Sequence, residues 1–306
     1  MQVTFLGTSG GAPTSLRGLS SVTVERGPEI IMFDCGEGTQ RQMAKAGLNL
    51  NKIEKILISH VHGDHILGIP GILQTLSLLN REKELFIYGA DGIIEFIKVV
   101  RKTIWFNPTF PIFVNQVKEG LVCKEKDYSI YATRNDHVLP GFGYALIEQE
   151  RPGKFYPERA RVLGVPEGPL WSKLQRGEDV KLNGKIIKSN EIVGCPRPGR
   201  KIVYTGDTRP SKAIVELAKN ADLLIHDSNY DEDYVEMARE KGHSTASQAA
   251  KIAVEANVNK LILTHFSPRY ESLDLMLLRA KNIFQNTIIA EDLMSIKVPL
   301  TDNDVF

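Results

Sequence analysis

Residues 55–65, KILISHVHGDH, join an Ile-rich strand pattern to the spacing H-x-H-x-D-H. Residues two apart on an extended chain point the same way, so His60 and His62 can reach one metal ion from one side. The chain turns at Gly63, which frees Asp64 and His65 to face a second metal ion. A lone histidine is more often structural than a ligand, but this dense cluster reverses that expectation. The segment therefore predicts a metal site, and its imidazole and carboxylate ligands suit zinc.

Further ligands for a two-metal site stand far along the chain, each just after an expected strand. His137 follows a strand expected over 128–133, and Asp207 and His265 follow strands expected over 201–205 and 260–264. Side chains at the ends of several strands converge on one edge of a sheet. Each signal is weak alone, because Asp207 also suits a turn or a helix N-cap and His265 also suits a core position.

Two of the seven histidines then remain, His226 and His243. His243 precedes a helix expected over 245–256, and its spacing leaves a capping-loop role and a catalytic role equally open. We expect His226 to be a buried, hydrogen-bonded residue. The glycine loop at 7–11 matches neither the dinucleotide-binding spacing nor the Walker A spacing, so we expect no nucleotide cofactor. Its amides and hydroxyls could still line a phosphate-binding edge.

The composition excludes several classes of protein. Of the 306 residues, 42% are hydrophobic and 25% charged, which is typical of a globular protein with a large core. The 38 Lys and Arg nearly balance the 37 Asp and Glu, so overall charge does not hold this chain to nucleic acid or membrane. The longest apolar uncharged run has 15 residues, fewer than the ~20 that span a bilayer. With three scattered cysteines and no secretory pattern, we expect a cytoplasmic protein without a membrane partner.

One segment, residues 151–188, differs from the rest of the chain. It holds five Gly and four Pro, a composition that predicts few regular core elements. Its nine Lys or Arg against four Asp or Glu give a net charge of +5. A solvated surface loop is one interpretation, and a functional insert is the other, since loops this long are usually functional or disordered. Elsewhere strands and helices alternate, which predicts mixed sheets flanked by helices.

The H-x-H-x-D-H motif with distant His, Asp and His resembles the metallo-β-lactamase superfamily, and the match runs along the whole chain in the expected order. The resemblance implies an α/β (α+β) fold, the αββα sandwich, as a single domain over residues 1–306. It also implies two Zn²⁺ at one edge of the two sheets. One ion would be held by His60, His62 and His137 and the other by Asp64, His65 and His265, with Asp207 bridging both.

Within that superfamily the chain resembles the ribonuclease Z family of tRNA 3′-processing endonucleases. The motifs that carry the resemblance are FLGTSGG (5–11), FDCGEGTQRQ (33–42), SHVHGDHILGIPG (59–71), RPGKF (151–155), EGPLWSKLQRG (167–177), YTGDTRP (204–210), HDSNY (226–230), GHSTASQAA (242–250) and LTHFSPRY (263–270). The family implies a homodimer that cuts the 3′ trailer from precursor tRNA, leaving a 3′-hydroxyl on the tRNA and a 5′-phosphate on the trailer.

In the same family, the insert is a protruding, flexible arm that grips the tRNA elbow. That implies a tRNA exosite at 151–188, and its +5 charge agrees, because phosphate contacts need Lys and Arg. The substrate-binding side chains expected there are Lys154, Arg159, Arg161, Lys173 and Arg176.

The expected chemistry is hydrolysis by a metal-bound hydroxide that Asp64 orients or deprotonates. His243, oriented by Asp227, would stabilise charge or protonate the leaving 3′-oxygen. Asp227 is a departure, since glutamate is common there in the family, and its shorter side chain puts the pairing with His243 in question. Two other functions stay open: a zinc phosphodiesterase for small phosphodiesters, which needs no basic arm, and a redox di-iron protein on the same scaffold.

Overall fold

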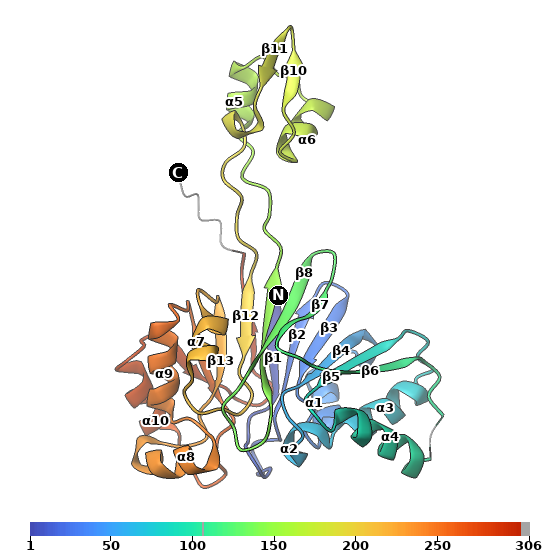
Figure 1. The fold of residues 1–306 in the computed structure, drawn as a ribbon, viewed down its shortest axis with the longest axis vertical. Helices are drawn as coiled ribbons and strands as arrows, with labels where there is room; N and C mark the ends of the chain where they lie inside the picture. The colour runs from blue at the N-terminus through green and yellow to red at the C-terminus, as the bar shows by residue number, and fades with distance from the viewer. Residues whose placement is uncertain (106, 301–306) are drawn as a thin grey trace. The chain divides into compact units, whose positions relative to one another are not determined.

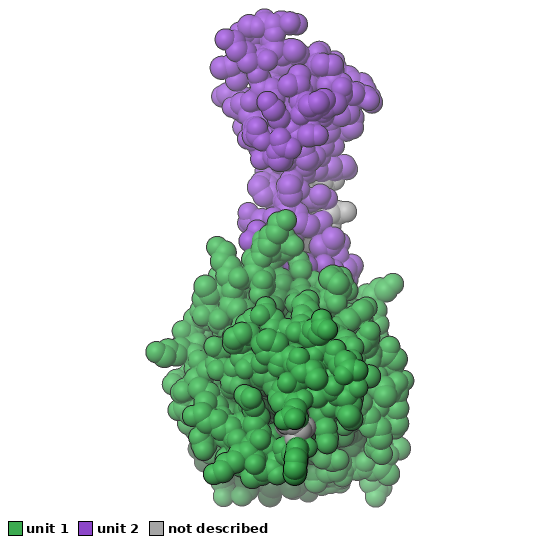
Figure 2. Space-filling model, turned by 90° about the vertical axis from the view of Figure 1, so that its right-hand side faces the viewer, with its two compact units in different colours: residues 1–146, 201–298 green, residues 147–200, 299–306 purple. Residues whose placement is uncertain are grey.

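The computed structural model describes residues 1–105 and 107–300, which form two compact units, coloured separately in Figure 2. The first unit comprises residues 1–146 and 201–298. The second comprises residues 147–200 together with 299 and 300. No helix among the described residues is long and apolar enough to cross a membrane.

The first unit contains two seven-stranded sheets. The first sheet has the strand order β16-β1-β2-β3-β4-β5-β6, and its strands β3 to β6 run parallel. Strand β4 is buried on both faces, as parallel strands usually are, because Leu57 packs between the sheets while Ile56 and Ile58 pack against helices. The strands are β1 (Gln2–Gly7), β2 (Ser21–Arg26), β3 (Glu29–Phe33), β4 (Ile53–Ile58), β5 (Leu85–Gly89), β6 (Ile112–Gln116) and β16 (Ser295–Lys297).

The second sheet has the order β15-β14-β13-β12-β9-β8-β7, and β12 to β15 run parallel. One apolar core lies between the two sheets and includes Phe5 and Leu57 from the first and Tyr204 and Ile225 from the second. The strands are β7 (Gly120–Lys124), β8 (Tyr128–Arg134), β9 (Phe142–Glu148), β12 (Lys201–Tyr204), β13 (Leu223–Asp227), β14 (Leu261–Thr264) and β15 (Thr287–Ile289).

Helices cover the outer face of each sheet (Figure 1). On the first sheet lie α1 (Thr39–Lys45), α3 (Ile69–Leu78) and α4 (Ile93–Thr103), and on the second lie α7 (Lys212–Ala218), α9 (Ala246–Glu255) and α10 (Asp274–Lys281). The expected αββα sandwich is therefore confirmed. Shorter elements complete the unit: α2 (Gly63–Ile66), α8 (Val235–Lys241), and the 3₁₀ turns η1 (Leu50–Lys52) and η3 (Glu232–Tyr234).

The second unit contains regular elements with a small core of their own, so the expectation of few such elements at 151–188 is wrong. The elements are α5 (Pro157–Val162), α6 (Pro169–Gln175), β10 (Val180–Leu182), β11 (Lys185–Ile187) and the 3₁₀ turn η2 (Ser189–Glu191). Both helices begin with proline, which is favoured at a first helical position. Asn183 and Gly184, at φ 47° and 80°, form the turn of the β10–β11 hairpin. The buried core residues are Ala160, Val165, Leu174, Val180, Ile187 and Ile192.

Candidate metal centre

The candidate metal centre lies where parallel strands of both sheets end. Residues 60–65 follow β4 and continue into α2, Asp207 follows β12, and His265 follows β14. His137 comes from the loop between β8 and β9. Open α/β sheets usually bind small molecules and ions beyond the carboxyl ends of their strands, and these side chains meet at that place.

His60, His62 and His137 form the first group of donors. The Nδ1 atom of His62 lies 2.8 Å from Nε2 of His60 and 3.3 Å from Nε2 of His137. Asp207 Oδ2 is 3.6 Å from Nε2 of His60. One ligand atom from each of these four residues therefore lies within 4.8 Å of the others.

Asp64, His65 and His265 form the second group. The Nε2 atoms of His65 and His265 are 3.3 Å apart, and Asp64 Oδ2 lies 3.4 Å from the first and 3.3 Å from the second. Asp207 also faces this group, since its Oδ2 is 3.4 Å from His65 Nε2 and its Oδ1 is 3.3 Å from His265 Nε2. The fold thus brings all seven predicted metal-binding residues together, with Asp207 between the two groups.

The chemistry of these donors fits a bound metal. His65 Nδ1 lies 2.7 Å from an Asp34 carboxylate oxygen and His137 Nδ1 lies 2.7 Å from the Gly242 carbonyl, so both Nδ1 atoms donate and both Nε2 atoms present lone pairs to the centre. Among the described residues the buried Asp207 Oδ1 finds no hydrogen-bond donor. Lone pairs and carboxylates at such distances repel one another without a cation. The centre is therefore built for a metal cofactor.

Asp34 supports this centre. The sequence motifs discussed above assign it no role. Its buried carboxylate accepts hydrogen bonds from Ser59 N (2.7 Å), Ser59 Oγ (2.8 Å), Tyr204 OH (2.7 Å) and His65 Nδ1 (2.7 Å). Asp34 thereby fixes the turn into the histidine motif and the ring of His65. The signal that could have found it is an aspartate directly after a buried strand, in FDCGEG.

Asp227 and His243 form the expected pair although Asp227 is shorter than glutamate. His243 Nδ1 lies 2.9 Å from Asp227 Oδ2, and the carboxylate also accepts from the backbone N–H groups of Thr208 (3.1 Å) and Asn229 (2.9 Å). Burial raises the pKa of the Asp227 carboxyl, but His243 and His265 together outweigh burial, so the net pKa lies below its ordinary value. Asp227 is therefore ionised at neutral pH.

A pocket of about 510 Å³ opens over the centre. The glycine loop reaches it, but its amides are not free to hold a phosphate. The N–H of Gly10 donates to Phe266 O (2.9 Å), that of Gly11 to Asp64 Oδ2 (2.7 Å), and that of Ala12 back to Gly10 O (2.9 Å). These amides therefore do not form the phosphate-binding edge that the sequence left open. Lining residues include Gly11, His62, Asp64, His137, Asp207, Asn229, Tyr230, Lys241, His243 and His265.

The five basic side chains predicted to bind substrate all lie exposed on the second unit. Arg161 and Arg176 pair with Glu167 and Glu178 at 2.7 and 2.9 Å. Arg159 and Lys154 lie over the Tyr156 ring, 4.3 and 5.7 Å from its centroid. Lys173 stands in the last turn of α6.

Comparison with known proteins places the chain in a family. The model of the Beta-lactamase superfamily domain matches residues 191–266, and that of the Anti-Pycsar protein Apyc1 matches residues 1–97. Ribonuclease Z of Methanosarcina acetivorans is 46% identical over 300 residues, which cover 98% of both chains. The chain belongs to the ribonuclease Z family. Ribonuclease Z of Methanosarcina mazei is 44% identical over 98% of both chains.

Among solved structures, the short form of human tRNase Z shares the ribonuclease Z fold with this chain. The two superimpose with a TM-score of 0.74 at 30% sequence identity, covering 98% of this chain and 100% of the human one. The family likeness therefore extends over nearly the whole chain, and so over both units.

Proposed function

We propose that this member of the ribonuclease Z family is a metal-dependent endoribonuclease that removes the 3′ trailer from precursor tRNA. The products would be a tRNA with a 3′-hydroxyl and a trailer with a 5′-phosphate. The observation that carries the proposal is 46% identity to a ribonuclease Z over 98% of both chains. The imidazole and carboxylate donors that converge in the candidate metal centre, five of which line one pocket, support it.

Two Zn²⁺ are the proposed cofactor. His60, His62 and His137 would hold one ion and Asp64, His65 and His265 the other, and the position of Asp207 between both groups supports its role as the bridge. When bound, such ions supply Lewis-acid charge and lower the pKa of water toward ~7. The nitrogen and oxygen donors agree with zinc, which prefers these ligands in four-coordinate sites.

The chain's own residues would move the protons. Asp64 lines the pocket, and the Gly11 N–H holds one of its oxygens, so the carboxylate is oriented to position the attacking water and accept its proton. As the new P–O bond forms, the bond from phosphorus to the 3′-oxygen breaks. His243 also lines the pocket, and because Asp227 holds its Nδ1, its Nε2 is available to give that oxygen a proton.

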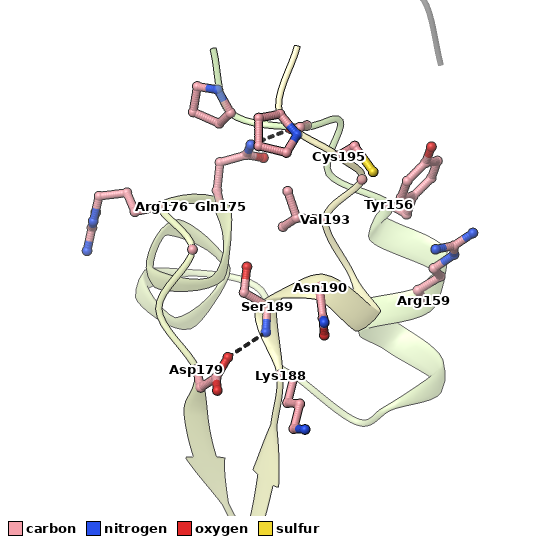
Figure 3. Close-up of a pocket in the computed structure, with 15 residues that line it drawn as sticks. Tyr156, Arg159, Gln175, Arg176, Asp179, Lys188, Ser189, Asn190, Val193 and Cys195 are labelled. Atoms are coloured by element: carbon pink, nitrogen blue, oxygen red, sulfur yellow. Dashed lines mark hydrogen bonds between the residues drawn. The ribbon is translucent and has the colours of Figure 1, made fainter. Parts of the chain in front are cut away.

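The second unit is the proposed arm for tRNA, with Lys154, Arg159, Arg161, Lys173 and Arg176 contacting phosphates. Figure 3 shows Arg159 and Arg176 on opposite sides of a pocket of about 850 Å³ in this unit, with Lys188 on a third side. Asp179, its one acidic lining residue, accepts from the Ser189 N–H at 2.9 Å. A concave surface edged by three cations suits an RNA backbone.

Two finer points belong to the same proposal. The active form would be a homodimer, as the family resemblance implies. The protein would act in the cytoplasm, and its three cysteines, all free of disulfides, agree with a reducing compartment.

The deciding experiment incubates the purified protein, loaded with zinc, with a precursor tRNA carrying a 3′ trailer. We expect one cut near the end of the acceptor stem, with a 3′-hydroxyl on the tRNA and a 5′-phosphate on the trailer, mapped by end-labelling. An Asp64→Ala variant is the control for a contaminating nuclease. Hydrolysis of a small phosphodiester without cleavage of the tRNA would favour the small-molecule phosphodiesterase instead.

A further inference from the structure

Residues 8–18, here called loop 8–18, carry the glycine that contacts Asp64, yet little packing holds the tip of this loop. Residues 11–16 are all exposed, and a pocket of about 620 Å³ lies against them, lined by Thr14, Leu16 and Arg17 among others. Apolar burial therefore does not fix the tip of the loop. Its position must come from polar contacts at its two ends.

The Asp292 carboxylate ties both ends of loop 8–18 together, beside the backbone hydrogen bond from the Ser9 N–H to Gly18 O (2.9 Å). It accepts hydrogen bonds from Thr8 Oγ1 (2.7 Å) at the start of the loop and from the Gly18 N–H (2.6 Å) at its end. Gln42 of α1 donates to the same carboxylate at 2.8 Å. Arg17 reinforces the contact by donating to Thr8 Oγ1 (2.7 Å) and to Ala290 O (2.8 Å).

The other side of loop 8–18 touches the metal centre. The Gly11 N–H donates to Asp64 Oδ2 at 2.7 Å, with Gly11 at φ 76°, a conformation that favours glycine. Beside it, the Gly10 N–H donates to Phe266 O, next to His265. A Cβ at Gly10 would lie 2.7 Å from Cε1 of His265, so the loop also fits closely against that ring.

We infer that Asp292 is a positioning residue: by tying the ends of loop 8–18 it holds the Gly11 N–H against Asp64 and so orients that carboxylate in the metal centre. The inference rests on the proposed function only for the catalytic effect. The orientation of Asp64 is a property of the fold. Because a carboxylate shared by metal and water must keep one oxygen fixed, a loosened loop would lower both metal affinity and turnover.

The test compares Asp292→Asn with a matched control, Asp222→Asn. Asp222 likewise accepts hydrogen bonds from a backbone N–H, that of Lys201 (2.8 Å), and from a side-chain amide, that of Asn259 (3.2 Å). It precedes β13, at the end of that strand opposite to the metal centre. Outer partners of metal ligands typically affect affinity or activity by about 10–100-fold. We expect Asp292→Asn to lower kcat and the affinity for Co²⁺ by about this factor with KM changed less than about 3-fold, and Asp222→Asn to change none of them.

Three readouts separate positioning from general stability. Hydrogen exchange of the 8–18 peptide in the metal-free protein should rise in Asp292→Asn and stay unchanged in Asp222→Asn. The visible spectrum of the Co²⁺-loaded protein should shift only in Asp292→Asn. In an Asp64→Ala background, Asp292→Asn should reduce the residual turnover by less than about 2-fold, because residues acting as a unit are not additive.

The inference is overturned if Asp292→Asn loses stability as the control does while its exchange, Co²⁺ spectrum and kcat match the parent. It is also overturned if Asp292→Asn lowers turnover as much in the Asp64→Ala background as it does in the parent protein. If the parent protein fails to cleave precursor tRNA but the exchange and Co²⁺ spectrum still change in Asp292→Asn alone, the proposed function fails and this inference stands.

Discussion

Replacing Asp34 by asparagine should damage the fold and the metal centre together. Oδ2 accepts from three donors, Ser59 Oγ, Tyr204 OH and His65 Nδ1, and Oδ1 accepts from Ser59 N. An amide has only one oxygen, which would take the Oδ2 position and its three bonds. The amide nitrogen would then face the Ser59 N–H, where two donors meet without an acceptor.

The cost of Asp34→Asn follows from these contacts. One buried donor left without an acceptor costs about 1–3 kcal/mol. Hydrogen bonds to a charged group contribute about 1 kcal/mol more than neutral ones, and three such bonds lose their charge. We therefore expect the free energy of unfolding to fall by about 4–6 kcal/mol, a large part of the ~5–15 kcal/mol of an ordinary domain.

The metal centre should respond as well. His65 donates from Nδ1 to the Asp34 carboxylate, which makes its Nε2 a better ligand. With a neutral amide in its place, we expect zinc affinity to fall by about 10–100-fold. Zinc titration measures the affinity, and urea unfolding of the metal-free protein measures the stability.

Tyr204→Phe is the matched control, since it removes one donor and keeps the Asp34 carboxylate and the ring packing against Phe33. Its expected cost is about 1 kcal/mol with zinc affinity nearly unchanged. If Asp34→Asn were no more harmful than Tyr204→Phe in both measurements, the account of Asp34 as the support of His65 would be wrong.

Four further outcomes are expected. Asp64→Ala should lower kcat at least ~10³-fold and reduce bound zinc, measured by metal analysis; normal turnover would refute its role. His243→Ala should lower kcat on precursor tRNA by ~10²–10⁴-fold but slow a nitrophenyl phosphodiester less, because that leaving group needs no proton; equal losses would exclude proton donation. Arg151 and Arg197 pair as neighbouring strand residues, so a two-residue Asn-Gly turn can replace residues 152–196 between them. This deletion should leave hydrolysis of the small phosphodiester unchanged, weaken binding of precursor tRNA and flatten the salt dependence of that binding. Equal loss of activity on both substrates would refute the role of the second unit as a tRNA-binding arm. Burial lowers the pKa of His226 below 6.5. The unfolded chain therefore binds a proton that the folded chain excludes, and the free energy of unfolding falls as pH drops below about 6.5. In His226→Gln, urea unfolding should show a smaller loss of stability over this pH range, and an unchanged loss would contradict the role given to His226.

Sequence alone could single out the candidate donors that the structure brings together, because their signals are local. H-x-H-x-D-H lies within six residues. Asp207 and His265 come within three residues of the end of the apolar strands β12 and β14, and His137 comes three residues after β8. Strand ends of a parallel sheet share one edge, so order along the chain translates into proximity. The same logic would have singled out Asp34, which follows β3.

Residues that act only through tertiary contacts could not be predicted in this way. Asp292 lies more than 270 residues from Thr8 and Gly18 in the chain, and no local pattern connects them. The second unit differs from its prediction for another reason. A high content of Gly and Pro suggests few regular elements, but Pro157 and Pro169 begin helices and Asn183-Gly184 forms a hairpin turn. Their position within the segment, rather than their number, carries the structural information.

The origin of the ligands has a consequence for stability. Residues 60–65 come from the first sheet, and His137, Asp207 and His265 come from the second, so a metal ion held by both sets joins the two sheets. Because the unfolded chain offers no such preformed site, metal binding adds to the free energy of folding. Without the ion, the buried Asp207 Oδ1 has no hydrogen-bond donor among the described residues, and that cost opposes the closure of the sandwich. The centre that serves the chemistry is thus also a reversible cross-link between the two halves of the fold.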